Sequence, residues 1–173
     1  MQIQFNTSTM HLKDMPLDVG YASEAVTLKD PQGKEHSIGG QKGKTQLLIT
    51  LPFIDETFTN ELKMIVNDLP KGAQGEYEVT SALIVANNTH KRPQIEGLDF
   101  FIDENKEFAD YYAVGLSGEP CEGELTKALI LVSKDGAIFY DEFSGNICDR
   151  FNMEALGRKI LAAQQCYTGK GCH

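Results

Sequence analysis

Apolar residues recur along the chain in two spacings, one typical of buried strands and one typical of helices. Short apolar runs predict core strands at 46–51, 77–86 and 98–102. Between the first two, apolar side chains three and four residues apart predict a helix over about 56–69, which Pro70 and Gly72 would stop. A helix between core strands indicates a crossover connection.

The rest of the chain predicts a hairpin at each end of the fold and two more helices. Glycines and prolines divide residues 10–40 into short extended pieces, as in a β-hairpin region, and residues 105–112 predict a helix. The runs 127–133 and 137–143 flank Asp135-Gly136, a pair that supplies the positive φ angles of a tight hairpin. A last helix is expected from an N-cap at Asn152 to about residue 166. The fold class is therefore α/β: a three-layer, thioredoxin-like fold with a central mixed sheet and an N-terminal β-hairpin.

Length, composition and charge narrow the class of protein. The chain has 173 residues, of which 41% are hydrophobic and 24% charged, as in an ordinary globular domain with its own core. Its formal net charge of −9 repels phosphate backbones, so we expect no nucleic-acid partner. The chain has no apolar run of roughly 18 residues, and its polar start does not resemble a secretory signal, so we expect no membrane partner and a cytoplasmic protein.

The cysteines are concentrated toward the C-terminal half, and two lie in an unusual tail. We expect one domain over residues 1–165 and a tail over 166–173 that holds Cys166, Cys172 and His173. The tail's glycines would allow a Cys166–Cys172 disulfide. Three roles of the tail are compatible with its sequence: a redox pair, a zinc-binding segment and an inert chain end. Zinc takes about four ligands and the tail offers three, while Cys148 would lie about 25 Å away across the last helix. We expect no metal site and no cofactor.

The segment 47–62, LLITLPFIDETFTNEL, carries the most informative pattern. A core strand ends at Pro52, and a helix begins just after Asp55. This resembles the active-site segment of bacterial thiol peroxidases, the atypical two-cysteine peroxiredoxins, where a strand ends in Pro-Ser-x-Asp-Thr-x-Val-Cys. Here Glu56 occupies the threonine position of that pattern, and Thr59 occupies the position of the peroxide-reducing (peroxidatic) cysteine.

The resemblance extends over roughly residues 10–165. Glu96-Gly97-Leu98 is similar to the family's Ala-Glu-Gly-Leu segment, and the order of Phe108, Tyr112, Gly115, Pro120 and Gly123 follows its pattern. The resemblance implies the peroxiredoxin subtype of the fold and a homodimer. It also implies a family activity, the reduction of hydrogen peroxide and organic hydroperoxides with thioredoxin as reductant.

The positions that carry this antioxidant chemistry differ here. Peroxide reduction needs a thiolate that becomes a sulfenic acid, and a threonine hydroxyl cannot replace it. A carboxylate at Glu56 would disfavour a thiolate. The family's arginine aligns with Lys127, which lacks the planar guanidinium, and the region of the resolving cysteine, 92–95, has none. We therefore expect weak or absent peroxidase activity. Glu56 and Thr59 would either stabilise a helix start or, with Lys127, bind a polar small molecule.

Two alternatives use other features of the chain. Cys121 could be a relocated nucleophile, but Glu119, Glu122 and Glu124 surround it in sequence, and their charge would raise its pKa, which favours a plain loop cysteine. A thiol oxidoreductase using Cys121 or the Cys166/Cys172 pair is one alternative, and a non-catalytic dimeric interaction module is the other. A divergent thiol peroxidase-like redoxin with a redox-linked or binding role is the first hypothesis.

Overall fold

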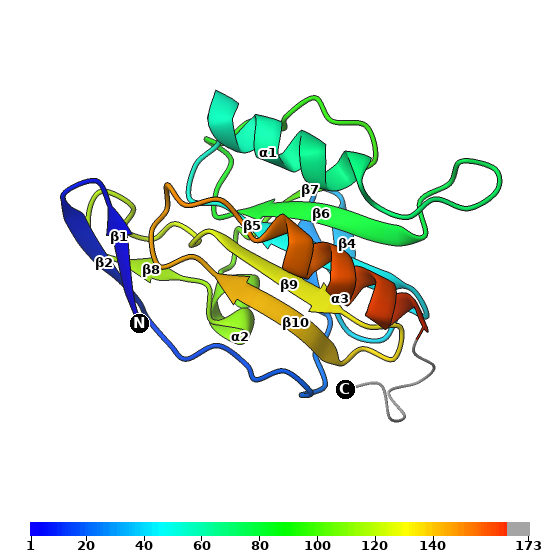
Figure 1. Cartoon of the computed structure of the whole chain (residues 1–173). Coiled ribbons are helices and arrows are strands. Elements are labelled where there is room, and N and C mark those ends of the chain that lie inside the picture. Colours follow the sequence, from blue (N-terminus) through cyan, green and yellow to red (C-terminus); the bar gives the residue numbers. More distant parts are fainter. Residues whose placement is uncertain (166–173) are drawn as a thin grey trace.

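The computed structural model describes residues 1–165, and its centre is a seven-stranded mixed sheet (Figure 1). From one edge to the other the strands are β10 (Ile138–Phe143), β9 (Ala128–Val132), β5 (Thr45–Thr50), β6 (Val79–Val85), β7 (Leu98–Ile102), β3 (Val26–Lys29) and β4 (Glu35–Ile38). The central three, β5, β6 and β7, are parallel, and their neighbours on both sides run antiparallel. The sheet is therefore mixed, as the sequence predicts.

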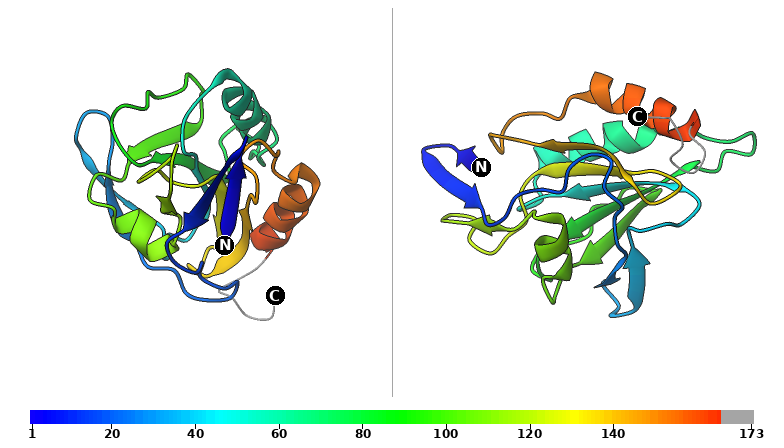
Figure 2. Two further views of the ribbon diagram at one scale, coloured as in Figure 1. Left: turned by 90° about the vertical axis from the view of Figure 1, so that its left-hand side faces the viewer. Right: turned by 90° about the horizontal axis from the view of Figure 1, so that it is seen from below.

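Three helices lie on the two faces of this sheet: α1 (Glu56–Asn67), α2 (Glu107–Tyr112) and α3 (Met153–Gln165). Figure 2 shows α1 and α3 on one face and α2 on the other. Successive side chains of a strand point to opposite faces, so Leu47 and Ile49 of β5 join the core under α1 and α3, while Leu48 joins the core under α2. Burial on both faces explains the continuous apolar runs and confirms the three-layer, thioredoxin-like arrangement.

The helices lie close to their predicted bounds: α1 ends two residues before its predicted end, α2 begins two residues after its predicted start, and α3 begins directly after the predicted N-cap Asn152. Pro70 follows α1, and the backbone N–H of Asp68 closes that helix by donating to the carbonyls of Met64 and Ile65. Within residues 1–165, none of the helices combines the length and apolar character needed to cross a membrane.

The N-terminal hairpin begins earlier than the sequence predicts. Strands β1 (Gln2–Phe5) and β2 (Ser8–Leu12) pair with each other, and β2 also pairs with β8 (Leu116–Ser117) to form a separate small sheet. Our prediction began at residue 10 and missed β1. Its signal was the alternation of Ile3 and Phe5 with two glutamines, since Ile3 is buried and the glutamines are not.

The turn between β9 and β10 corrects one detail. Gly136 has a φ of 90°, but Asp135 is not among the residues with positive φ. The N–H of Gly136 donates to the carbonyl of Ser133 at 2.9 Å, and the N–H of Ser133 donates to Ala137 at 2.9 Å. The connection is thus a three-residue loop with one glycine in the left-handed region, not a two-residue turn with two such residues.

Candidate functional site

The segment that resembles the thiol peroxidase site connects the end of β5 to the start of α1. Asp55 has an extended φ of −124°, and its Oδ1 accepts a hydrogen bond from the N–H of Phe58 at 2.8 Å. A carboxylate in this position satisfies an otherwise unpaired amide of the first helical turn. Proline and aspartate therefore form a strand-to-helix connection that places Thr59 in the first turns of α1.

Thr59 and Glu56 make the contacts of an ordinary helix start. The Thr59 hydroxyl donates to the Asp55 carbonyl oxygen at 2.7 Å, and the Thr59 N–H donates to the same oxygen at 2.9 Å. Glu56 is exposed in the first turn, where the helix dipole favours a negative charge. The Thr59 hydroxyl is thus directed back to the backbone of its own helix.

Lys127 directly precedes β9 and is almost completely buried, with 1% of its surface exposed. Its ammonium lies 2.7 Å from Oε1 of Glu61 and donates to the carbonyl of Asp149 at 2.5 Å. The rings of Phe58 and Phe151 lie 4.9 Å and 4.6 Å from the same nitrogen, within the range of cation–π attraction. We call Lys127, Glu61, Phe58 and Phe151 the ion-pair cage.

Glu61 joins three separate segments. Its side chain is 7% exposed; one carboxylate oxygen pairs with Lys127, the residue before β9, and the other accepts from the N–H of Phe151 at 2.7 Å. Phe151 belongs to the connection between β10 and α3. One carboxylate on α1 therefore contacts both the residue before β9 and the segment that leads into α3. The sequence analysis missed Glu61. The signal was present: it stands three residues after Phe58 and four before Ile65, on the apolar side of the helix.

The arrangement separates the predicted site residues from one another. Lys127 forms its ion pair with Glu61 and not with Glu56, within the residues that the structure describes. Thr59 bonds only to its own helix start in that same part of the chain. A cation with a buried carboxylate partner is already neutralised, so it contributes little attraction to a second anion.

Cys121 is part of the apolar core rather than an exposed loop. It is 5% exposed and belongs to the same buried cluster as Ile3 and Met10 of the N-terminal hairpin. Burial is the largest cause that raises the pKa of the Cys121 thiol, and the charges of Glu124 and Glu119 add to it. The sequence analysis also predicted a raised pKa for Cys121, but from the neighbouring glutamates alone. The larger cause, burial, depends on the folded structure. A protonated, buried thiol is a poor nucleophile.

This predicts slow and alkaline-shifted labelling of Cys121. In native protein, iodoacetamide should modify the exposed Cys148 well before Cys121, as peptide mass mapping would show. The native fold holds the Cys121 proton more tightly than the unfolded chain does. Its contribution to stability is therefore complete below the ordinary thiol pKa and is lost as the pH rises through the raised value. Labelling of Cys121 at neutral pH as fast as Cys148 would contradict this assignment.

The structure describes two of the four cysteines and allows a search for metal-binding groups. Cys148 and Cys121 are both free, and Cys166 and Cys172 lie outside the residues that the structure describes. Within residues 1–165, no group of three histidine, cysteine, aspartate or glutamate side chains is arranged to hold a metal ion.

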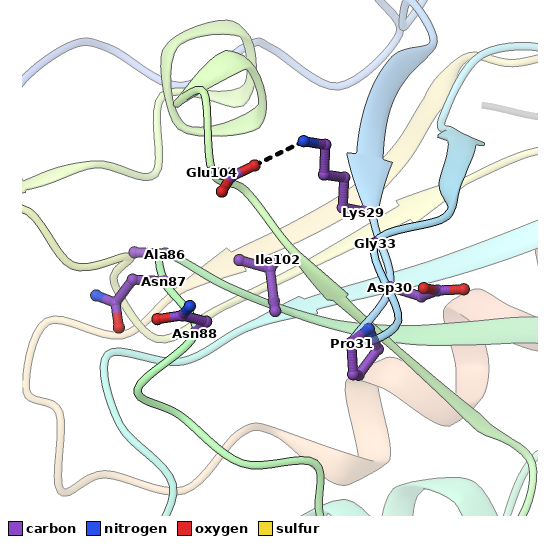
Figure 3. A pocket seen from close by; sticks show the side chains of 9 residues that line it. All are labelled: Lys29, Asp30, Pro31, Gly33, Ala86, Asn87, Asn88, Ile102 and Glu104. Atoms are coloured by element: carbon purple, nitrogen blue, oxygen red, sulfur yellow. Dashed lines mark hydrogen bonds and ion pairs between the residues drawn. The ribbon is translucent and has the colours of Figure 1, made fainter.

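A cavity of about 330 Å³ lies where β6 and β7 end, beside the turn between β3 and β4 (Figure 3). Open α/β sheets place ligands at the carboxyl ends of parallel strands, so the location is suited to binding. Its charged groups already have partners, however: Lys29 bonds Glu104 at 2.9 Å, and Asp30 bonds His36 at 2.8 Å. The sequence analysis did not identify this cavity.

Solved structures with the same architecture include a peroxiredoxin-like protein and a thiol peroxidase. A peroxiredoxin-like protein from Aquifex aeolicus matches with a TM-score of 0.77 and 19% identity, covering 94% of this chain and 96% of that one. A thiol peroxidase from Chromobacterium violaceum matches with a TM-score of 0.77 and 16% identity, covering 95% and 97%. BsSco, a member of the Sco family of cytochrome c oxidase assembly proteins, matches with a TM-score of 0.60 and 18% identity, covering 89% and 100%. No protein-family model and no curated protein sequence matches the chain. At these identities, the likeness establishes the peroxiredoxin-type, thioredoxin-like fold.

Proposed function

We propose that this chain is a divergent thiol peroxidase-like redoxin that does not turn over peroxides and acts in a redox-linked or binding role. The observation that carries the proposal is the pairing of Lys127 with Glu61. In the resemblance, Lys127 aligns with the arginine that supports the reactive thiolate. Here its charge is held by a buried carboxylate 2.7 Å away, so that support is withdrawn.

The chemistry at Thr59 points the same way. Peroxide reduction forms a bond between a thiolate sulfur and one peroxide oxygen while the O–O bond breaks, and the leaving oxygen must be stabilised and protonated. Thr59 offers no sulfur, its hydroxyl is bonded to Asp55, and the nearest first-turn charge is the carboxylate of Glu56. The start of α1 thus has no sulfur nucleophile at Thr59, and the nearby charge of Lys127 is already paired with Glu61.

The thiol-based alternative has less support. Cys121 is buried with a raised pKa, so a thioredoxin-type reductant would have little to act on there. The fold alone does not decide the activity, since BsSco, a member of the Sco family of cytochrome c oxidase assembly proteins, has a similar architecture. We further propose that the protein is cytoplasmic and that it forms a homodimer. Light scattering, which measures molar mass, would test the homodimer.

Thr59→Cys provides the test of the site. We expect its new thiol to be oxidised by hydrogen peroxide no faster than that of Asn60→Cys, a control on the next, exposed position of the same helix. The reason is that neither thiol gains a cation, because Glu61 already holds Lys127. Sulfenic acid formation is followed by trapping with dimedone and peptide mass mapping, which separates the new thiol from the native ones.

Two results would contradict the proposal. One is rapid, stoichiometric oxidation of any native thiol of the wild-type protein by hydrogen peroxide. The other is a Thr59→Cys thiol that reacts far faster than the Asn60→Cys thiol, because that would mean that the pocket still activates sulfur.

A further inference from the structure

Met64 lies on the exposed side of α1, with its thioether open to water. The chain has five methionines, and 47% of the Met64 surface is exposed, whereas Met10 is fully buried. Met64 follows Glu61 by three residues on the helix, but it belongs to neither of the two buried clusters of apolar side chains. Small molecules in solution can therefore reach its sulfur.

The sulfur of Met64 has a cationic neighbour from another segment of the chain. Nη2 of Arg150 donates toward this sulfur across 3.9 Å. Arg150 belongs to the connection between β10 and α3, and Figure 2 shows α1 and α3 on the same face of the sheet. Within residues 1–165 Arg150 forms no ion pair, so its guanidinium keeps its charge and most of its five N–H donors available.

Met64 and Arg150 line one cavity of about 230 Å³, which has ample room for a molecule as small as hydrogen peroxide. One other charged side chain, Glu61, lines it. Both carboxylate oxygens of Glu61 are already engaged, one by the Lys127 ammonium and the other by the N–H of Phe151. Arg150 is therefore the charged group of this lining that is free to act on a molecule beside the Met64 sulfur.

We propose that Met64 accepts an oxygen atom from hydrogen peroxide, assisted by Arg150. The sulfur lone pair forms a bond to one peroxide oxygen while the O–O bond breaks, and the other oxygen leaves as hydroxide. The proton of the transferred hydroxyl group then neutralises that hydroxide, so the products are methionine sulfoxide and water. The sulfur is oxidised by two electrons and the peroxide is reduced. The Arg150 guanidinium donates hydrogen bonds to the leaving oxygen, on which negative charge develops.

Exposure alone would give a different order of reactivity among the methionines. Met15 is 89% exposed and Met1 is 58% exposed, so both would react before Met64 if access to water were the only factor. The guanidinium beside Met64 is what reverses that order. The reaction is a single, stoichiometric oxidation of a thioether. It uses neither a thiol nor Thr59, so it does not depend on the function proposed above.

The test is the oxidation of the intact protein by hydrogen peroxide, followed over time by peptide mass mapping. At about pH 5 the thiols are protonated and react slowly, whereas a thioether has no proton to lose. Met15 in the same sample serves as the reference, because it is the more exposed methionine. We expect Met64 to be converted to the sulfoxide at least as fast as Met15.

Arg150→Gln separates the effect of the guanidinium from that of exposure. This exposed substitution should lower the oxidation rate of Met64 about threefold, the effect of one exposed charge-assisted hydrogen bond, and leave the rate of Met15 unchanged. The matched control Arg92→Gln removes another exposed guanidinium and should change neither rate. The proposal is overturned if Met64 reacts more slowly than Met15, if Arg150→Gln leaves the Met64 rate unchanged, or if Arg92→Gln lowers it as much.

Discussion

Replacing Glu61 with alanine is expected to lower the free energy of unfolding by roughly 3–5 kcal/mol, a large part of the stability of a domain of this size. The reason is that Lys127 is 1% exposed and would be left as a buried charge without its carboxylate partner. The amide of Phe151 would also lose its acceptor. Urea denaturation at neutral pH measures the change.

The control is an acidic residue in an exposed ion pair. Glu154 bonds Arg158 at 2.8 Å one turn apart on α3, with both side chains largely in water. Glu154→Ala should cost less than about 1 kcal/mol. The double variant Glu61→Leu/Lys127→Met removes both charges and should be more stable than Glu61→Ala alone. If Glu61→Ala costs no more than Glu154→Ala, the ion-pair cage is not the structural unit that we describe.

Replacing Phe58 with alanine is expected to cost about 3–5 kcal/mol as well, for a different reason. Its buried ring packs against Phe53 at 5.1 Å and lies 4.9 Å from the Lys127 ammonium. Removing the ring leaves a cavity beside the cation and gives water access to the ion pair. Denaturation measures the free energy, and hydrogen exchange of the Phe151 amide, which donates to Glu61, reports the access of water.

A conservative variant separates volume from cation–π attraction. Phe58→Leu keeps much of the apolar volume and should cost less than Phe58→Ala, with little change in the exchange of the Phe151 amide. Faster exchange at Phe151 in Phe58→Ala but not in Phe58→Leu would show that apolar volume at position 58, rather than the aromatic ring itself, seals the cage. Unchanged exchange in both variants would show that Phe58 does not seal it.

The sequence by itself determined the order of elements and the local geometry of the α1 start. Both depend on short-range rules: apolar spacing locates β5, β6 and α1, and an aspartate before a helix caps it, as Asp55 does for Phe58. Thr59 could be placed in the first turns of α1 for the same reason. The sequence analysis missed strand β1 and predicted a different turn at Asp135-Gly136, because short elements are set partly by what they pack against.

Only the tertiary structure decided which charges meet and which thiols are accessible. Glu61 and Lys127 are far apart in the chain, and nothing local distinguishes that pairing from one with Glu56. In the fold, α1 packs its apolar side on the sheet, and Glu61 is on that side. Its carboxylate therefore lies beside Lys127, the residue before β9, and pairs with it. Burial likewise raises the pKa of Cys121, which lies in the same core cluster as Ile3 and Met10 of the N-terminal hairpin. Desolvation and long-range pairing depend on the packed fold, so a single sequence does not reveal them.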